Sequence, residues 1–342
     1  MPHKVFLSFL WPSLIVMILF IALPIVSVVY QSLHVEHEQI MIVGETCGPF
    51  GCTEEVSVDA EAMGKLREEK PAGRFNGLGT YFNESHLATD EIAEIFATSA
   101  DFREFRNRVM NLPFYNALIF TVSYTLIVTP LVMLVGFIIA IVVNMVPRLF
   151  KGPVIFFSLL PMIVTPLIGS LVLFWMIDSR GVIGASLQVL FADPTLSLKA
   201  SPTLTWVTLF TYGVWHSAPF AFVVFYAGLQ TVPQDTMESA MVDGANRWER
   251  IRFVTIPHLM PLAIFVALMQ LMDNFRVFEP IIGFAASASA SSLSYLIFND
   301  LRISNTPLFG SAAATSMLTI FGIIILLLPV LRQNWREFNR KS

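Results

Sequence analysis

Six long apolar runs constrain this chain more than any other feature. Each has few charges and reaches the roughly 20 residues that a helix needs to cross the hydrocarbon core of a membrane. The runs are Trp11–Tyr30, Asn116–Val143, Pro153–Ile177, Leu204–Leu229, Pro261–Phe284 and Ala312–Leu331. Only 13% of the residues are charged, whereas ordinary globular domains carry about a quarter. The sequence therefore predicts an all-α, polytopic membrane protein with six transmembrane helices.

The first apolar run is predicted to stay in the mature protein. It follows Lys4, as a signal peptide would, but it is longer than a typical signal-peptide core, and no clear small-residue cleavage site follows it. The resulting division of the chain is an N-terminal tail with the first helix, a hydrophilic loop region, a core of five helices and a short tail. These parts cover residues 1–31, 32–112, 113–335 and 336–342.

Cationic residues predict how the helices are oriented, because Lys and Arg are enriched on the cytoplasmic side of membrane proteins. One set of connections is rich in them: Lys4, Arg148, Lys151, Arg247, Arg250, Arg252, Arg332, Arg336, Arg340 and Lys341. The opposite short loops hold only Arg180, Lys199 and Arg302. We therefore expect both termini to be cytoplasmic and residues 32–112 to form an extracytoplasmic loop region between helices 1 and 2.

The chain has two cysteines, Cys47 and Cys52, in a Gly- and Pro-containing stretch of that loop region. No further ligands lie nearby, so a zinc site is not expected. In an oxidising compartment a disulfide between them is favoured. Two free thiols remain the alternative.

Several prolines lie inside the apolar runs, including Pro130, Pro161, Pro166 and Pro219. A membrane protein tolerates such breaks where neighbouring helices or a water-filled cavity satisfy the freed carbonyls. Broken helices are frequent in transporters. Simple kinking for packing is an equally good interpretation of any single proline.

A mostly polar stretch, residues 235–261, separates the fourth and fifth runs. Asp235 and Glu238 have capping-box spacing, which predicts a short helix there, and Gly244 is suited to end it in a left-handed conformation. A second amphipathic run, Trp248–Thr255, follows and is predicted to stop at Pro257 and Pro261. The sequence thus predicts a helix–Gly–helix elbow that suits docking into a groove of a partner.

This stretch resembles the EAA loop of the membrane subunits of binding-protein-dependent ABC importers. Glu238-Ser239-Ala240, Asp243-Gly244-Ala245 and Thr255-Ile256-Pro257 match its three conserved positions. An ordinary interfacial loop helix is the alternative. The resemblance implies that an ATPase subunit docks on Glu238, Ser239, Ala240, Met241, Asp243, Gly244, Ala245 and Arg247.

Further segments are similar to the carbohydrate-uptake branch of this family. They are Trp215–Pro233, Leu160 to Trp175, Phe75–Tyr81 and Phe275–Glu279. Two departures stand out: residues 34–73 look inserted, and Ala285–Ser292 replaces the usual Gly-rich stretch. The resemblance implies a type I ABC importer permease fold in a bacterial inner membrane, importing an oligosaccharide, glycoside or glycerol-phosphate-like solute.

The chain itself has no nucleotide site of the GxxxxGK[ST] type, and no metal cluster or catalytic set stands out. The resemblance implies that the chain is no enzyme, and that ATP and Mg are bound by two separate ATPase subunits. It also implies a second homologous permease and an extracytoplasmic solute-binding protein as partners, beside the membrane lipid and the carbohydrate solute. A net charge of −4 offers no basic field for nucleic acid.

Polar residues inside the runs are candidates for the solute path, since ionisable groups within a membrane face a cavity or one another. The candidates are Asp273, Asn274, Arg276 and Glu279, together with the aromatic Trp215 and Tyr212. Internal ion pairing is an equally good interpretation of the charged residues, and interfacial belts are the usual place of aromatic ones. Two other classes of protein stay open from the residues alone: an ion-coupled secondary transporter and a membrane-embedded glycosyltransferase.

Overall fold

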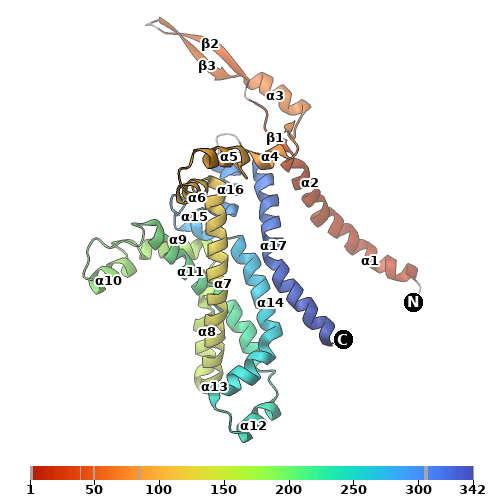
Figure 1. Ribbon diagram of the computed structural model, residues 1–342, viewed down its shortest axis with the longest axis vertical. Coiled ribbons are helices and arrows are strands. Elements are labelled where there is room, and N and C mark those ends of the chain that lie inside the picture. The colour runs from red at the N-terminus through yellow and green to blue at the C-terminus, as the bar shows by residue number, and fades with distance from the viewer. Residues whose placement is uncertain (1–2, 39, 49–50, 84, 304–306, 342) are drawn as a thin grey trace. The chain divides into compact units, whose positions relative to one another are not determined.

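The structure is a computed structural model, which describes residues 3–38, 40–48, 51–83, 85–303 and 307–341 (Figure 1). The chain forms two compact units. Unit 1 comprises Met1–Tyr115 with Leu296–Ile320, and unit 2 comprises Asn116–Tyr295 with Phe321–Ser342. Each unit is described by itself.

Unit 1 begins with one long apolar helix. It consists of α1 (His3–Met17), a π-helical turn η1 (Ile18–Ala22) and α2 (Leu23–Ser32). Its most apolar 18-residue window, within Leu10–Ser32, buries no residue in the protein, as expected of a helix that lipid surrounds. This agrees with the first predicted span.

The segment after α2 mixes small helices and strands. The helices are α3 (Ala60–Glu69), α4 (Gly79–Phe82), α5 (Thr89–Thr98) and α6 (Phe102–Met110). Strand β1 (His34–Val35) pairs antiparallel with β4 (Arg74–Phe75), and β2 (Met41–Gly48) pairs antiparallel with β3 (Gly51–Val58). Unit 1 is completed by η3 (Asn299–Ile303) and the start of α17 (Phe309–Lys341).

The β2–β3 hairpin places the two cysteines directly opposite one another. Cys47 and Cys52 are register partners in the ladder. The side chains of both lie outside the part of the chain that the structure describes, so the disulfide remains a prediction.

Unit 2 is built from helices. They are α7 (Pro113–Met145), α8 (Arg148–Ile163), α9 (Pro166–Met176), α10 (Val182–Leu190), α11 (Pro202–Leu229), α12 (Gln234–Val242), α13 (Arg247–Arg250), η2 (Ile251–Thr255), α14 (Ile256–Phe275), α15 (Glu279–Gly283) and α16 (Leu293–Phe298). The last helix, α17, continues into this unit.

The core of unit 2 lies along one face of α7. The residues of this face recur every four positions, which forms one ridge of an α-helix. They are Phe120, Tyr124, Val128, Val132, Gly136 and Ala140. At Gly136 the helix approaches α11 so closely that a Cβ atom would lie 2.6 Å from the Ala221 Cβ. Small residues at such contacts allow helices to pack tightly in a membrane.

Among the described residues, five helices are long and apolar enough to span a membrane, or six if one bent pair counts as a span. The bent pair is α8 with α9, which meet at 95°. The predicted third span, Pro153–Ile177, is thus divided into two helices at Val164 and Thr165, which have extended backbone as residues before a proline favour. Of the two interpretations of Pro166, a broken helix rather than a simple kink is the one that the structure shows. The fifth span also differs: it runs over Arg247–Phe275 and ends nine residues before the predicted Phe284.

Candidate functional site

The elbow predicted between the fourth and fifth spans is present, and Gly244 forms its corner. Helix α12 ends at Val242, and Gly244 has φ +82°. Its amide donates to the Met241 carbonyl at 3.1 Å, and the Ala245 amide donates to the Ala240 carbonyl at 2.9 Å. This pair of bonds is the Schellman motif, which satisfies the last carbonyls of a helix. The predicted role of Gly244 in ending the helix is confirmed.

The capping of the elbow differs from the prediction. Helix α12 begins at Gln234 after Pro233, without a side-chain cap, so the capping box expected at Asp235 and Glu238 is wrong. A complete capping box instead opens α13: the Glu249 amide donates to the Asn246 side chain at 2.9 Å, and the Asn246 amide donates to the Glu249 carboxylate at 2.8 Å.

The helix in the second half of the elbow also continues past the prolines at which it was predicted to end. Pro257 and Pro261 do not end it, because Pro257 occupies the first turn of α14 and Pro261 lies inside that helix. The helix runs on without a break from Arg247 to Phe275, so both prolines are accommodated inside it, although each removes one backbone donor. The wider π-helical turn η2 precedes α14, and its last bond joins the Ile256 amide to the Ile251 carbonyl.

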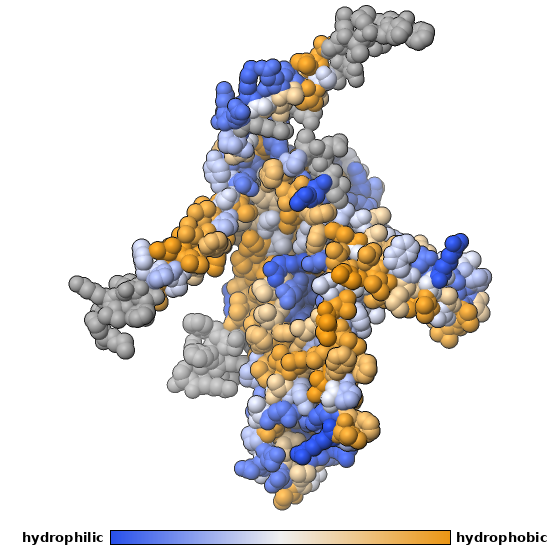
Figure 2. Space-filling view, turned by 180° about the vertical axis from the view of Figure 1, so that it is seen from behind, coloured by the Kyte–Doolittle hydropathy of each residue, from blue (hydrophilic) through white to orange (hydrophobic). Residues whose placement is uncertain are grey.

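The elbow is almost entirely exposed. No side chain from residues 234–254 is buried, and Val242 is 88% exposed. In the space-filling view the end of unit 2 that carries α12 and α13 is largely hydrophilic, with hydrophobic patches between (Figures 1 and 2). The large apolar residues exposed there are Met241, Val242, Trp248 and Phe253.

The charged groups of the elbow are free to pair with another protein. Glu238, Asp243 and Arg247 make no ion pair with any residue that the structure describes. Exposed apolar side chains beside unpaired charges are typical of a surface that a partner covers.

The base of the elbow is held between α11 and α14. Where the elbow leaves and re-enters the bundle, the Thr231 hydroxyl lies 3.0 Å from His258 Nε2. The Gln230 amide donates to the Asn144 side chain at 3.2 Å. A force on the elbow would therefore reach both helices at their ends.

A second candidate site lies at the bend between α8 and α9. The Tyr212 hydroxyl donates to the Pro166 carbonyl in the first turn of α9 at 2.6 Å. Tyr212 is buried, and its ring stacks on His216 with centroids 5.8 Å apart. A buried tyrosine thus ties the broken span to α11.

Trp215 and Glu279 lie at the exposed side of this cluster. The Trp215 ring is 6.0 Å from that of Tyr212 and is 44% exposed. Glu279 is exposed at the start of α15, and its charge acts on Tyr124, Tyr212 and His216. The buried Nδ1 of His216 has no hydrogen-bond partner among the residues that the structure describes. This cluster combines an aromatic face with polar groups, the combination that binds sugar rings and hydroxyls.

The remaining candidates for the solute path separate into two kinds. Asp273 and Arg276 form an ion pair at 2.9 Å, with both side chains more than half exposed. Asn274 points into the protein instead, where its amide donates to Thr129 of α7 at 3.0 Å. The structure therefore places Trp215, Glu279, Asp273 and Arg276 at the surface of unit 2, and Asn274 and Tyr212 in its interior.

Sequence reasoning missed three members of these sites. Val242 and Phe253 are among the most exposed apolar residues of the elbow, and no pattern in the sequence singled them out. His216 is not among the predicted solute-path residues, although its spacing of four from Tyr212 places the two on one helix face.

These features define a class of protein: a polytopic membrane subunit with a broken span and an exposed elbow for a partner. Residues 108–334 match the family described as the binding-protein-dependent transport system inner membrane component. The chain belongs to this family. It is therefore the permease subunit of an ABC importer, and ATP hydrolysis is carried out by a separate ATPase.

Relatives of this chain are also named as transport permeases. The chain is 31% identical over 144 residues to the trehalose/maltose transport system permease protein MalF of Thermococcus litoralis, a match that covers 41% of this chain and 48% of that protein. It is 29% identical over 238 residues to the probable ABC transporter permease protein YesP of Bacillus subtilis, covering 67% and 75% of the two chains.

Solved structures support the fold. A chain of a bacterial ABC transporter involved in the import of the acidic polysaccharide alginate matches with a TM-score of 0.56. The match covers 81% of this chain and 99% of the other, at 20% identity. This likeness shows the type I permease fold.

Proposed function

We propose that this chain is the permease of an ATP-driven importer for a carbohydrate or sugar derivative, and that the elbow transmits the motion of an ATPase pair. The observation that carries the proposal is the elbow itself, a helix–Gly–helix corner with exposed apolar side chains. The bond between Thr231 and His258 joins its two ends, and the bond between Gln230 and Asn144 joins its base to α7. ATPase closure would push Glu238–Gly244, and the helices would rock between outward and inward opening.

Val242 offers the sharpest test of docking. We expect Val242→Glu to abolish co-purification of the ATPase, because an unpaired charge would enter an apolar contact. Val189→Glu on α10 is the matched control, since Val189 is also a valine, with 82% exposure. The ATPase should co-purify normally with that variant. Normal co-purification with Val242→Glu would refute docking on this surface.

Carbohydrate as the solute is supported by the relatives and by the cluster at the bend. One relative is named for trehalose and maltose transport, and a further relative, the permease protein MdxF of Bacillus subtilis, is named for maltodextrin transport. The exposed Trp215 offers a flat face beside polar groups. We expect Trp215→Ala to raise the uptake KM for the oligosaccharide that the importer carries. Trp175→Ala on α9 is the control, because Trp175 is 66% exposed but belongs to no such cluster.

The solute itself can be found with labelled trehalose, maltose, maltodextrin and alginate oligosaccharides. Uptake of one of them that depends on this chain would support the carbohydrate class. ATP-dependent transport of an amino acid or peptide alone would overturn it, while leaving the docking proposal intact.

The partners and orientation are part of the same proposal. A second permease, two ATPase subunits with their ATP and Mg, and an extracytoplasmic solute-binding protein would complete the importer. With Arg247, Arg250 and Arg252 beside it, the elbow would lie in the cytoplasm together with both termini. Reporter fusions at the C-terminus test this orientation.

A further inference from the structure

A buried histidine in unit 1 joins the segment after α4 to the start of α17. His86 has no exposed surface. Its Nε2 lies 3.1 Å from both the Ser311 carbonyl and the Thr315 hydroxyl, and its Nδ1 lies 2.7 Å from the Asn83 side-chain oxygen. Because a carbonyl can only accept, Nε2 must carry the hydrogen.

The same turn of α17 is held by two acidic residues. The Ser311 hydroxyl donates to Asp300 at 2.6 Å. One residue earlier, the Gly310 amide donates to Glu36 at 3.0 Å. Glu36 follows β1, in the segment 34–73 that looks inserted in the sequence. Three separate parts of unit 1 thus meet on the first turn of α17.

We propose that His86, with Asn83, Ser311, Thr315 and Asp300, forms a latch that holds the first turn of α17 to the extracytoplasmic segment and releases it when that side becomes acidic. The latch is closed around a neutral imidazole. The ring's one hydrogen satisfies Ser311, and the amide of Asn83 can turn to donate to Nδ1.

Protonation works against the closed latch because the new charge would be buried without a carboxylate in hydrogen-bonding contact. Asp300 is hydrogen-bonded to Ser311, and its charge acts on the imidazole from there. Burial lowers the pKa of His86, against smaller raising effects from the Ser311 carbonyl, the Asp300 charge and the Thr80 carbonyl. The closed form therefore binds fewer protons than the open form, and acid favours opening.

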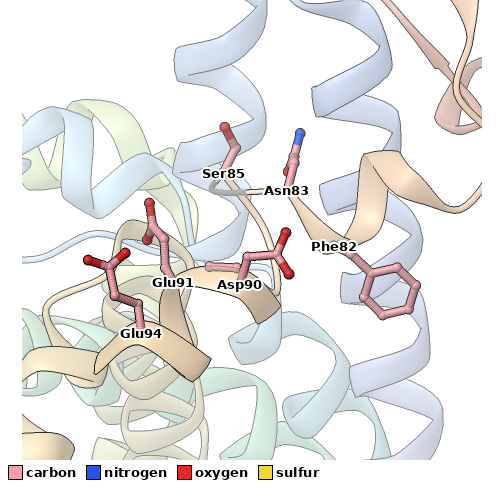
Figure 3. Close-up of a pocket in the computed structure, with 7 residues that line it drawn as sticks. Phe82, Asn83, Ser85, Asp90, Glu91 and Glu94 are labelled. Carbon is pink, nitrogen blue, oxygen red and sulfur yellow. The ribbon is translucent and has the colours of Figure 1, made fainter. Parts of the chain in front are cut away.

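Other titratable groups of unit 1 bear on the pH dependence of the latch. Burial raises the pKa of Asp300, which stabilises the closed form as pH falls, so Asp300 acts in the opposite direction from His86. Asp90, Glu91 and Glu94 line a pocket of about 510 Å³ beside Asn83 (Figure 3). Glu84 lies outside the described residues.

Hydrogen exchange on the full-length chain in lipid nanodiscs tests the latch without solute, nucleotide or partner. Peptides covering residues 83–92 and 308–316 are followed at pH 7.5 and 5.5, after correction for intrinsic exchange. We expect acid to increase the opening constant of both peptides by up to about tenfold, the limit for one group whose open-state pKa is about 6.5. Equal protection at both pH values would overturn the proposal.

Three variants identify the titrating group. His86→Gln keeps one donor and should show no acid-induced opening, whereas Asp300→Asn should keep it. Asn83→Asp places a carboxylate against Nδ1, so the imidazolium becomes paired and acid should close the latch rather than open it. Acid-induced opening that persists in His86→Gln, or is unchanged in Asn83→Asp, would overturn the assignment to His86. The result is independent of ATPase docking, so either proposal can fail alone.

Discussion

The amide of Asn274 on α14 donates to the hydroxyl of Thr129 on α7 at 3.0 Å, deep inside unit 2. Both side chains are buried. Thr129 belongs to a row with Thr121 and Thr125, and Thr121 accepts from the Leu293 amide at 3.1 Å. Polar side chains between membrane helices hold them together, since hydrocarbon offers no other partners. Asn274 therefore fixes α14, the helix that continues from the elbow, against α7.

Asn274→Ala should destabilise the helix bundle by about 1 kcal/mol, because it removes the bond and leaves Thr129 unpaired. Thr129→Val removes the same bond from the other side with nearly the same volume. The double variant should cost less than the sum of the two single variants. Denaturation in mixed micelles measures all three. Additive effects would show that the two side chains are not coupled.

Gly244 should be replaceable by Asn but not by Val. Its positive φ costs a β-branched residue about 1–2 kcal/mol, whereas Asn tolerates this conformation. No atom lies within 4 Å of the position of a Cβ, so backbone strain is the dominant effect. We expect trypsin to cleave after Arg247 and Arg250 about five- to thirtyfold faster in Gly244→Val.

The Gly244→Asn variant is the control for this experiment, with cleavage close to that of the native chain. The global unfolding temperature should barely change in either variant, because no side chain of residues 234–254 is buried. Equal cleavage of both variants would contradict the strained-corner explanation.

Gly136→Ala should destabilise unit 2, whereas Gly152→Ala should not. A Cβ at Gly136 would meet Ala221 and the Phe222 amide nitrogen at 2.6 and 2.8 Å, so α7 and α11 would have to move apart. Such overpacking typically costs about 1–3 kcal/mol. At Gly152 nothing lies within 4 Å, and alanine favours a helix by up to about 1 kcal/mol. Thermal unfolding of the two purified variants distinguishes them.

Cys47 and Cys52 should be joined by a disulfide in the mature protein. Directly opposed residues of an antiparallel ladder have Cα atoms about 4.5–5.5 Å apart, within the range that a disulfide spans. Mass spectrometry after alkylation should find both cysteines unmodified until a reductant is added. If both cysteines are alkylated without reductant in protein purified from the membrane, the disulfide is disproved.

The broad class and the elbow could be read from the sequence because they depend on local patterns. Runs of apolar residues report the membrane spans, and Gly244 is one of few residue types that suit a left-handed helix end. The family resemblance placed the docking residues on the same segment that the structure leaves exposed. These signals need no knowledge of what packs against them.

Local patterns did not predict helix ends correctly where the effect of a proline depends on the residues around it. The prolines near residue 260 are read as stops, but the helix continues through both of them from Arg247 to Phe275, with the wider π-helical turn η2 just before Pro257. The 95° bend before Pro166 is closed by Tyr212, which is 46 residues away in the chain.

By itself the sequence determined that the chain spans a membrane and that a glycine corner lies between its fourth and fifth spans, because hydropathy and backbone preference are properties of neighbouring residues. Only the tertiary structure decided which polar groups face one another. Asn274 is turned inward to Thr129 while Asp273 beside it is exposed, and His86 finds Ser311 more than 220 residues away. Such pairings follow from how helices pack, which no short stretch of sequence records.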